Sequence, residues 1–318
     1  MRRTEREATM SALPGQQITV PERLADTVRV WAGEEGLAWL AALPELVSGY
    51  LDRWGLTLER VADPGGPISL IGFVHRDDDL APAVLKAGLV TPETDREHAA
   101  LRHWAGRGAV LLVDADPAAG VLLLERLHGD IPLRSLAESK AMLEATGLLQ
   151  RLWVPPADGH PFRLVVDVAA ELSGRIAERR ALPGAEAAGP LVDEALETAA
   201  ALAGSEPERF LLHGDFHHGN VLAADRSPWL AIDPKPVVGE RAWDLAWLAQ
   251  DRMDTLAGSP GPRAAVRRRL QQLSGALEVD RDRLRGWTLF RTVEAGLWHL
   301  STGDRAAAEL YLEFAAWL

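Results

Sequence analysis

The sequence predicts an α+β fold in which a strand-rich first part is followed by a mostly helical second part. Residues 56–61, 68–74 and 83–86 are alternating or β-rich runs, and turn sequences rich in Pro, Gly and Asp separate them. From about residue 135 onward, apolar residues recur at the i, i+3 and i+4 spacing of helices packed on a core. Because strands joined by short turns pair antiparallel, we expect an antiparallel sheet first and helices after it.

The first part is expected to contain two helices and five strands. Residues 21–31 and 36–54 carry apolar side chains at helical spacing. The change from strands to helices near residue 127 predicts a boundary that divides the chain into 1–127 and 128–318. The strands of the predicted sheet are 56–61, 68–74, 83–86, 109–113 and 121–124.

The second part is expected to be helical apart from its polar loops. Residues 181–189 contain a Pro-Gly pair and a second Gly before Pro190, which indicates a loop between two helices. The sequence has no internal repeats. The predicted helices are 135–152, 161–180, 190–203, 240–253, 263–273, 281–299 and 304–318.

Composition and charge exclude several classes of protein. A formal net charge of −12 argues against nucleic acid as a partner, because phosphate backbones require clustered Lys and Arg. The absence of cysteine excludes disulfides and thiolate metal sites. Residues 1–16 are polar and aperiodic, predict a loose tail and lack the apolar run of a secretory signal. Since no apolar stretch reaches membrane-spanning length, we expect a cytoplasmic protein with no membrane partner; the oligomeric state stays open.

Two polar clusters follow apolar segments and carry the main functional signal. The first is His213-Gly214-Asp215-Phe216-His217-His218-Gly219-Asn220, after Phe210-Leu211-Leu212, and the second is Asp233-Pro234-Lys235, after Trp229-Leu230-Ala231-Ile232. An Asp with an Asn five residues later, then a strand-terminal Asp, is typical of phosphoryl-transfer sites. In that chemistry Asp215 accepts the proton of the attacking hydroxyl. The oxygens of Asn220 and Asp233 are hard ligands suited to Mg²⁺ on nucleotide phosphates.

The same residues permit two other interpretations. Three histidines beside an aspartate could form the metal site of a hydrolase, because imidazole and carboxylate suit zinc or iron. Alternatively, Asp and Gly could simply build tight turns. A catalytically inactive nucleotide-binding module is a further class.

The two clusters resemble motifs of a known family. The spacing H-x-D-x-x-x-x-N, followed by a strand-terminal Asp, resembles the catalytic and metal-binding loops of the protein-kinase-like fold. HGDFHHGNVL and PWLAIDPK are similar to the aminoglycoside phosphotransferase family, in its streptomycin 6-phosphotransferase and hydroxyurea phosphotransferase group. The resemblance implies a bilobal kinase-like fold, an antiparallel-sheet N-lobe, a mostly helical C-lobe, and ATP and Mg²⁺ as cofactors.

The resemblance also implies roles for residues of the first part. Lys86 ends the run Val84-Leu85-Lys86, which resembles the kinase V-A-I-K, and would contact the α- and β-phosphates. Glu97 is the expected carboxylate partner of that lysine, with Glu93 as the alternative.

Two further nucleotide-binding segments are implied. The Gly65-Gly66 turn, one hairpin before the lysine, would cover the phosphates, because glycine lets backbone N–H groups approach closely. The segment Glu125 to Leu127 would be the hinge whose backbone groups read the adenine edge.

The acceptor is expected to be a small polar molecule. The acidic chain is compatible with a cationic substrate, and the resemblance implies a streptomycin-type aminoglycoside. Hydroxyurea, a sugar or an amino alcohol are the alternatives. A protein substrate is not expected, because no activation-loop sequence ending in A-P-E follows Asp233.

Carboxylates of the second part have expected roles as well. The resemblance implies that Asp244 braces the catalytic loop through hydrogen bonds to its backbone, as a buried carboxylate requires. The alternative is an exposed acid at the start of a helix. Because streptomycin carries two guanidinium groups, carboxylates are expected to bind it; the candidates are Glu240, Asp251, Asp254 and Glu294.

Overall fold

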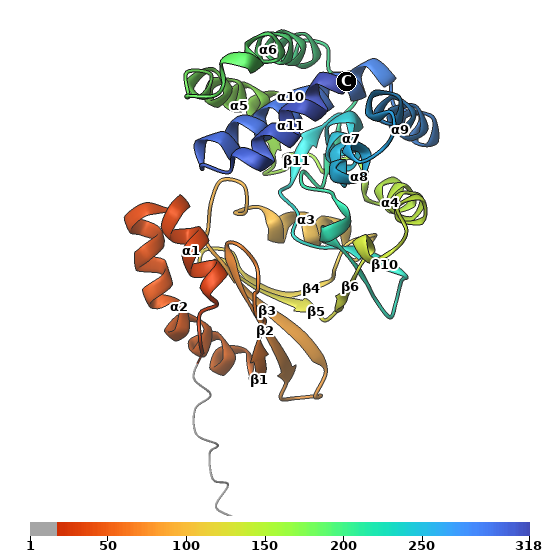
Figure 1. Cartoon of the computed structure of the whole chain (residues 1–318). Helices are drawn as coiled ribbons and strands as arrows, with labels where there is room; N and C mark the ends of the chain where they lie inside the picture. Colours follow the sequence, from red (N-terminus) through yellow and green to blue (C-terminus); the bar gives the residue numbers. More distant parts are fainter. Residues whose placement is uncertain (1–17) are drawn as a thin grey trace, which may run out of the picture. The chain divides into compact units, whose positions relative to one another are not determined.

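The computed structural model describes residues 18–318, which form two compact units (Figure 1). The described residues of the first are 18–90 and Val113–Arg126, and the second comprises Thr91–Leu112 and Leu127–Leu318. The tail predicted at 1–16 lies outside the described residues.

The division differs from a single boundary at residue 127 in one segment. Thr91–Leu112 belongs to the second unit, where its backbone and side chains find their partners. The indole of Trp104 donates to the carbonyl of Leu152 at 2.8 Å, and the Val110 N–H donates to the carbonyl of Ala231 at 2.9 Å. The segment Thr91–Leu112 is therefore part of the second unit, and the chain returns to the first unit for Val113–Arg126.

The first unit is a five-stranded sheet preceded by two helices. The strand order is β1-β2-β3-β5-β4, and the β1–β2, β2–β3 and β3–β5 pairs are antiparallel, as predicted. The elements are α1 (Glu22–Trp31), α2 (Gly33–Trp54), β1 (Leu56–Val61), β2 (Ser69–Arg76), β3 (Pro82–Gly88), β4 (Leu112–Asp116) and β5 (Val121–Glu125).

The helices α1 and α2 pack on the sheet through their apolar positions (Figure 1). Leu24 and Val28 are one helical turn apart on α1, and Leu43 and Val47 repeat that spacing on α2, so each helix buries one stripe. Removing this apolar surface from water stabilises the unit. The sheet residues of the same core include Leu58, Leu70, Val74, Leu85, Val121 and Leu123.

One predicted strand is displaced. Residues 109–113 were expected to be a strand, but β4 begins at Leu112. Ala109 instead forms a parallel bridge with Ala231 of the second unit. A buried apolar run satisfies either pairing, so its composition alone could not place it.

The second unit is mostly helical, with two small three-stranded sheets. The helices are α3 (Glu97–Trp104), α4 (Glu138–Leu152), α5 (Val165–Arg179), α6 (Gly189–Ala203), α7 (Arg241–Gln250), α8 (Met253–Ala257), α9 (Pro262–Leu277), α10 (Arg281–Ser301) and α11 (Arg305–Trp317). The strands are β6 (His128–Pro132), β9 (Val221–Ala223) and β10 (Trp229–Ala231) in one sheet, and β7 (Arg163–Leu164), β8 (Phe210–Leu212) and β11 (Val237–Gly239) in the other.

Two helix predictions need correction at their ends. The helix predicted at 161–180 begins only at Val165, because Arg163–Leu164 pair in parallel with β11. The helix predicted at 240–253 divides into α7 and α8 because Arg252 adopts a left-handed conformation, with φ of 54°. Within residues 18–318, none of the helices combines the length and apolarity needed to cross a membrane.

Candidate active site

Both polar clusters lie in the second unit, where strand pairing brings them together. The first cluster joins β8 to β9, and the second joins β10 to β11. Because β9 pairs with β10 and β8 with β11, both antiparallel, the loops are held side by side. The Lys235 N–H donates to the His213 carbonyl at 2.8 Å, and the Ile232 N–H donates to the Asn220 carbonyl at 2.9 Å.

Gly214 lies where the two loops come closest. Its φ is 77°, a region that favours glycine, and a Cβ at this position would lie 1.9 Å from the Lys235 carbonyl oxygen. Any side chain would push the loops apart. The glycine of the HGD motif is therefore a requirement of the close approach.

Asp215 lies at the centre of the two loops and is 7% exposed. The Asn220 amide nitrogen donates to the Asp215 carbonyl oxygen at 3.0 Å and lies 3.4 Å from its Oδ2. Lys235 Nζ lies 2.5 Å from the same Oδ2. Burial alone would raise the pKa of Asp215, but the charge of Lys235 beside it holds that pKa below its ordinary value. The carboxylate is thus ionised and oriented, as a general base must be.

Asn220 and Asp233 fit the requirements of a magnesium site. The Asn220 amide nitrogen is turned toward Asp215, so its oxygen faces the other way and can serve as a ligand. Asp233 adopts φ of 56°, a conformation that Asp tolerates better than most residues. Its charge raises the pKa of Lys235 and opposes the lowering of the pKa of Asp215, which places Asp233 beside both. Two hard oxygen donors flank the base, as the phosphoryl-transfer interpretation requires.

His213 is a buried, neutral support of the loop. Burial lowers its pKa to about 4. Its Nε2 lies 3.0 Å from the Ile232 carbonyl and therefore donates to it, which leaves Nδ1 to accept from the Asp215 N–H at 3.3 Å. Trp104 stacks on the imidazole, and Phe216 meets it edge-on. His213 thus joins the two loops without contributing charge.

Asp244 braces the first half of the loop, as predicted. Its fully buried carboxylate accepts the N–H groups of His213 at 2.9 Å and Gly214 at 2.7 Å, and the Trp153 indole N–H at 3.0 Å. Burial raises the pKa of Asp244 to about 6, although the three donors oppose this. Trp247 adds a fourth bond, from its indole to the Gly214 carbonyl at 2.8 Å.

Asp251 braces the second half. It accepts the His218 N–H at 2.7 Å, and the His218 imidazole lies 2.6 Å from the same oxygen. Burial alone would raise the pKa of Asp251, but contacts with His218 hold it well below its usual range. His217 turns to its own loop instead, where its Nδ1 accepts the Gly219 N–H at 3.1 Å.

The histidines of the first cluster therefore face three different partners. Throughout residues 18–318, no three His, Asp or Glu side chains converge to hold a metal ion. The hydrolase interpretation of the H-x-D-x-H-H sequence needs such a convergence and loses its support.

The predicted residues of the first unit have definite places within it. Lys86 lies on β3, opposite Ile71 of β2 and Leu122 of β5, and is 8% exposed. Glu125 ends β5 opposite Ala83.

The Gly65-Gly66 turn joins β1 to β2. Gly65 has φ of 67°, and a Cβ on Gly66 would lie 2.7 Å from the Ser69 hydroxyl oxygen. The turn is therefore closely packed on its own hairpin.

Glu97 and Leu127 belong to the second unit. Glu97 is the first residue of α3 and is 4% exposed, whereas Glu93 is exposed and lies 3.9 Å from Arg175 of α5. Leu127 is buried just after the last crossing between the units. Glu97 is thus the more buried of the two candidate acids.

Three of the four carboxylates expected to bind a cation have partners inside the protein. Glu240 is buried and accepts from Arg283 and from the Trp287 indole. Asp251 holds His218, as described above. Asp254 is exposed on α8, and Glu294 lies 3.2 Å from Arg179. The structure thus corrects the prediction for Glu240 and Asp251, whose charges are used inside the protein.

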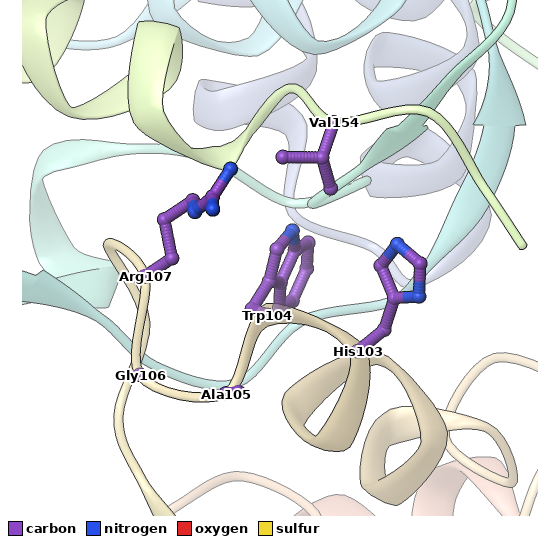
Figure 2. Close-up of a pocket in the computed structure, with 6 residues that line it drawn as sticks. All are labelled: His103, Trp104, Ala105, Gly106, Arg107 and Val154. Carbon is purple, nitrogen blue, oxygen red and sulfur yellow. The ribbon is translucent and has the colours of Figure 1, made fainter.

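A cavity of about 560 Å³ lies at the end of α3, away from these residues. Figure 2 shows the Trp104 indole between the His103 and Arg107 side chains, with Val154 across from it. None of the predicted site residues lines it. Two lining residues connect the cavity to the site: Trp104 stacks on His213, and the Val154 carbonyl accepts the N–H of Leu211 on β8 at 2.8 Å.

Sequence reasoning missed three contributors. Lys235 is brought to Asp215 by strand pairing between distant segments, and His218 meets Asp251, the residue that follows α7. Arg291 of α10 lies over the rings of Trp243 and Trp247, with 5.0 and 4.5 Å to their centroids. The one available signal was that the chain has only three lysines, one of them directly in the second cluster.

The fold and the site define a phosphotransferase with a protein-kinase-like fold. Residues 53–303 match the family described as aminoglycoside/hydroxyurea antibiotic resistance kinase, and the chain belongs to that family. The streptomycin 6-kinase of Streptomyces glaucescens is 40% identical over 291 residues, which are 91% of this chain and 93% of that protein. The hydroxyurea phosphotransferase of Kitasatospora aureofaciens is 38% identical over 309 residues, covering 93% and 84%. The family resemblance inferred from the two clusters is confirmed.

Solved structures confirm the predicted fold. The aminoglycoside phosphotransferase APH(4)-Ia has a TM-score of 0.59 at 15% identity, covering 86% of this chain and 97% of its own. The choline kinase LicA from Streptococcus pneumoniae has a TM-score of 0.60 at 12% identity, covering 86% and 99%. One ternary complex of a thermostable APH(4)-Ia mutant contains ADP and hygromycin B.

Proposed function

We propose that this chain is an ATP-dependent O-phosphotransferase that modifies a hydroxyl of streptomycin and so confers antibiotic resistance. The observation that carries the proposal is the cluster of Asp215, Asn220 and Asp233 on two joined loops of a member of this kinase family. The acceptor is inferred from the 40% identity to a streptomycin 6-kinase over nearly the whole chain. We propose cytoplasmic action, where ATP is available, without nucleic acid or membrane partners.

The proposed reaction is an in-line phosphoryl transfer. Asp215 takes the proton of the acceptor hydroxyl, the hydroxyl oxygen bonds to the γ-phosphorus, and the bridging oxygen leaves with ADP. Because the transition state is loose, positioning and electrostatics supply most of the catalysis. Magnesium bound with ATP would neutralise phosphate charge, and Asn220 and Asp233 are the residues that would hold it.

The nucleotide roles in the first unit remain part of the proposal. Lys86 is proposed to contact the α- and β-phosphates, and the Gly65-Gly66 turn to cover them. The segment from Glu125 to Leu127 is proposed to be the hinge whose backbone N–H and carbonyl groups bind the edge of the adenine ring.

Glu97 is proposed as the carboxylate that pairs with the phosphate-binding lysine. It is preferred to Glu93 because it is buried, whereas Glu93 is exposed beside Arg175. Burying a carboxylate is costly unless it has a charged or hydrogen-bonding partner, so the burial of Glu97 supports the pairing.

Hydroxyurea is the second candidate acceptor. The identity to a hydroxyurea phosphotransferase is nearly as high, 38% over 93% of the chain. The two acceptors differ greatly in size and charge, since streptomycin carries two guanidinium groups and hydroxyurea is small and neutral. Salt therefore separates them: binding of a dication through partly exposed carboxylates weakens as ionic strength rises, and binding of a neutral acceptor does not.

A panel assay tests the proposal. ADP release from ATP is measured with streptomycin, hydroxyurea, kanamycin, choline and simple sugars, and NMR of the product locates the phosphate. Streptomycin is expected to be phosphorylated at the 6-hydroxyl and kanamycin left unmodified. Turnover of hydroxyurea alone selects the second candidate. Turnover of only choline or a sugar overturns the resistance assignment but leaves the kinase chemistry intact.

A further inference from the structure

Backbone contacts alone fix the position of Lys235, apart from any contact of its side chain. Its N–H donates to the His213 carbonyl at 2.8 Å, and its own carbonyl abuts Gly214 so closely that no Cβ fits there. Both contacts fix the lysine to the loop that carries Asp215. The backbone from which the Lys235 side chain extends is thus fixed relative to the backbone of Asp215, the proposed base.

The side chain of Lys235 ends at the proposed base. Nζ lies 2.5 Å from Asp215 Oδ2, and the exposed fractions of the two side chains are 36% and 10%. The ammonium is therefore the open member of the pair, and the carboxylate is the enclosed one. Although burial opposes it, Asp215 and Asp233 raise the pKa of Lys235, so the side chain stays cationic.

An ammonium has three N–H donors, and Asp215 takes one of them. When Asp215 accepts a proton from the acceptor hydroxyl, that hydroxyl lies within hydrogen-bond reach of the same carboxylate. The phosphorus that the hydroxyl oxygen attacks is one bond further on. The remaining donors of Lys235 thus lie beside the place where negative charge must be carried during transfer.

We propose that Lys235 is a second lysine of the phosphoryl-transfer site, acting on both Asp215 and the transferred group. Its ammonium orients the Asp215 carboxylate through the contact with Oδ2, and donates to oxygens of the γ-phosphoryl group. It moves no proton: the proton of the acceptor goes to Asp215, and the electron pair of the broken P–O bond leaves with ADP. This inference rests on the proposed kinase function and adds a residue to it.

The experiment compares Lys235→Met, which keeps the length of the side chain without the charge, with Lys235→Arg. Lys140→Met is the control, since Lys140 is an exposed lysine on α4. Lys235→Met is expected to lower kcat by roughly 10²–10³-fold, the effect of removing one preorganised donor. KM for the acceptor is expected to stay within about threefold. Lys235→Arg is expected to recover part of the rate, because it restores charge with a different donor geometry.

The separation of turnover from binding and stability distinguishes this role from a merely structural one. A donor to the transferred phosphoryl group acts in the transition state, so kcat should fall in Lys235→Met while the affinity for ADP with magnesium and the melting temperature stay close to the wild type. Unchanged kcat, or a fall in kcat accompanied by a comparable loss of ADP affinity or of melting temperature, overturns the proposal.

The slow hydrolysis of ATP by water keeps this test separate from the proposed acceptor, because it needs no streptomycin and still transfers the γ-phosphoryl group. Its rate is expected to fall in Lys235→Met and to stay unchanged in Lys140→Met. If the wild type phosphorylates none of the acceptors but its ATP hydrolysis falls in Lys235→Met, the proposed acceptor fails and the role of Lys235 stands. An unchanged rate of hydrolysis in Lys235→Met overturns that role.

Discussion

The two halves of the loop His213–Asn220 are braced by buried carboxylates of opposite electrostatic character. Asp244 holds the first half through three neutral donors, and burial raises its pKa to about 6. Asp251 holds the second half beside a histidine, and its pKa lies well below its usual range. Hydrogen bonds from neutral donors orient the Asp244 carboxylate without fully compensating its desolvation, whereas the contacts with His218 lower the pKa of Asp251 in spite of its burial. The first brace should therefore respond to pH near neutrality, and the second only in acid.

The largest expected effect is that of removing the first brace. Asp244→Ala leaves the His213 and Gly214 N–H groups and the Trp153 indole without their acceptor in a buried site. Each unsatisfied donor costs about 1–3 kcal/mol, and removal of the buried carboxylate recovers part of that cost, so the free energy of unfolding should fall by about 3–5 kcal/mol, together with activity. Urea denaturation measures it. Asp282→Ala is the control, because Asp282 lies in the first turn of α10 and is exposed; an equal loss there would contradict the bracing role.

The glycines of the loop give the next effect. Gly214→Ala places a methyl group against the Lys235 carbonyl at a left-handed φ, and should cost about 2–4 kcal/mol. Gly219→Ala in the second half meets only the ring of His217, which can move, and should cost under about 1 kcal/mol. Thermal unfolding and kcat of both variants measure the contrast. Similar losses would show that the two halves are equally constrained.

The third effect is a change of stability with pH. The folded pKa of Asp244 lies above its unfolded value of 3.8, so the folded state binds more protons between about pH 4 and 6. The stability of the wild type relative to Asp244→Asn should therefore fall as pH rises through that window, by up to the order of 3 kcal/mol.

The second brace should give the opposite slope. The folded pKa of Asp251 is depressed, so its contribution is present above the ordinary carboxyl range and is lost as pH falls below about 4. Relative to Asp251→Asn, the wild type should keep a constant advantage from pH 5 to 8. If the stability differences between the wild type and the two variants changed with pH in the same direction, the two carboxylates would not differ as described.

Most helices and strands could be predicted from the sequence, because the spacing of apolar residues within one element reflects which face of that element is buried. Helical spacing placed α2 and α10, and the run Ile68–Val74 placed β2 within two residues at its ends. The strand predicted at 109–113 failed because Ala109 pairs with Ala231, 122 residues away. The spacing of apolar residues within a segment does not indicate which distant segment that segment pairs with.

The candidate site was predictable to the extent that its residues are close in sequence. Asp215, Asn220 and Asp233 were found because their spacing is that of a motif, and the structure brings them together. Lys235 is part of that motif, but its partner is 20 residues away, and only the pairing of β8 with β11 brings the two together.

The most direct test of the central claim is the turnover of Asp215→Asn with ATP, magnesium and streptomycin. The substitution keeps the shape of the side chain and removes its ability to accept the proton. Turnover should fall by roughly two to four orders of magnitude, while the melting temperature and its rise on adding ATP with magnesium stay close to the wild type. Asp158→Asn, in an exposed loop of the same unit, should keep full activity. Full activity in Asp215→Asn would contradict the assignment of this aspartate as the base.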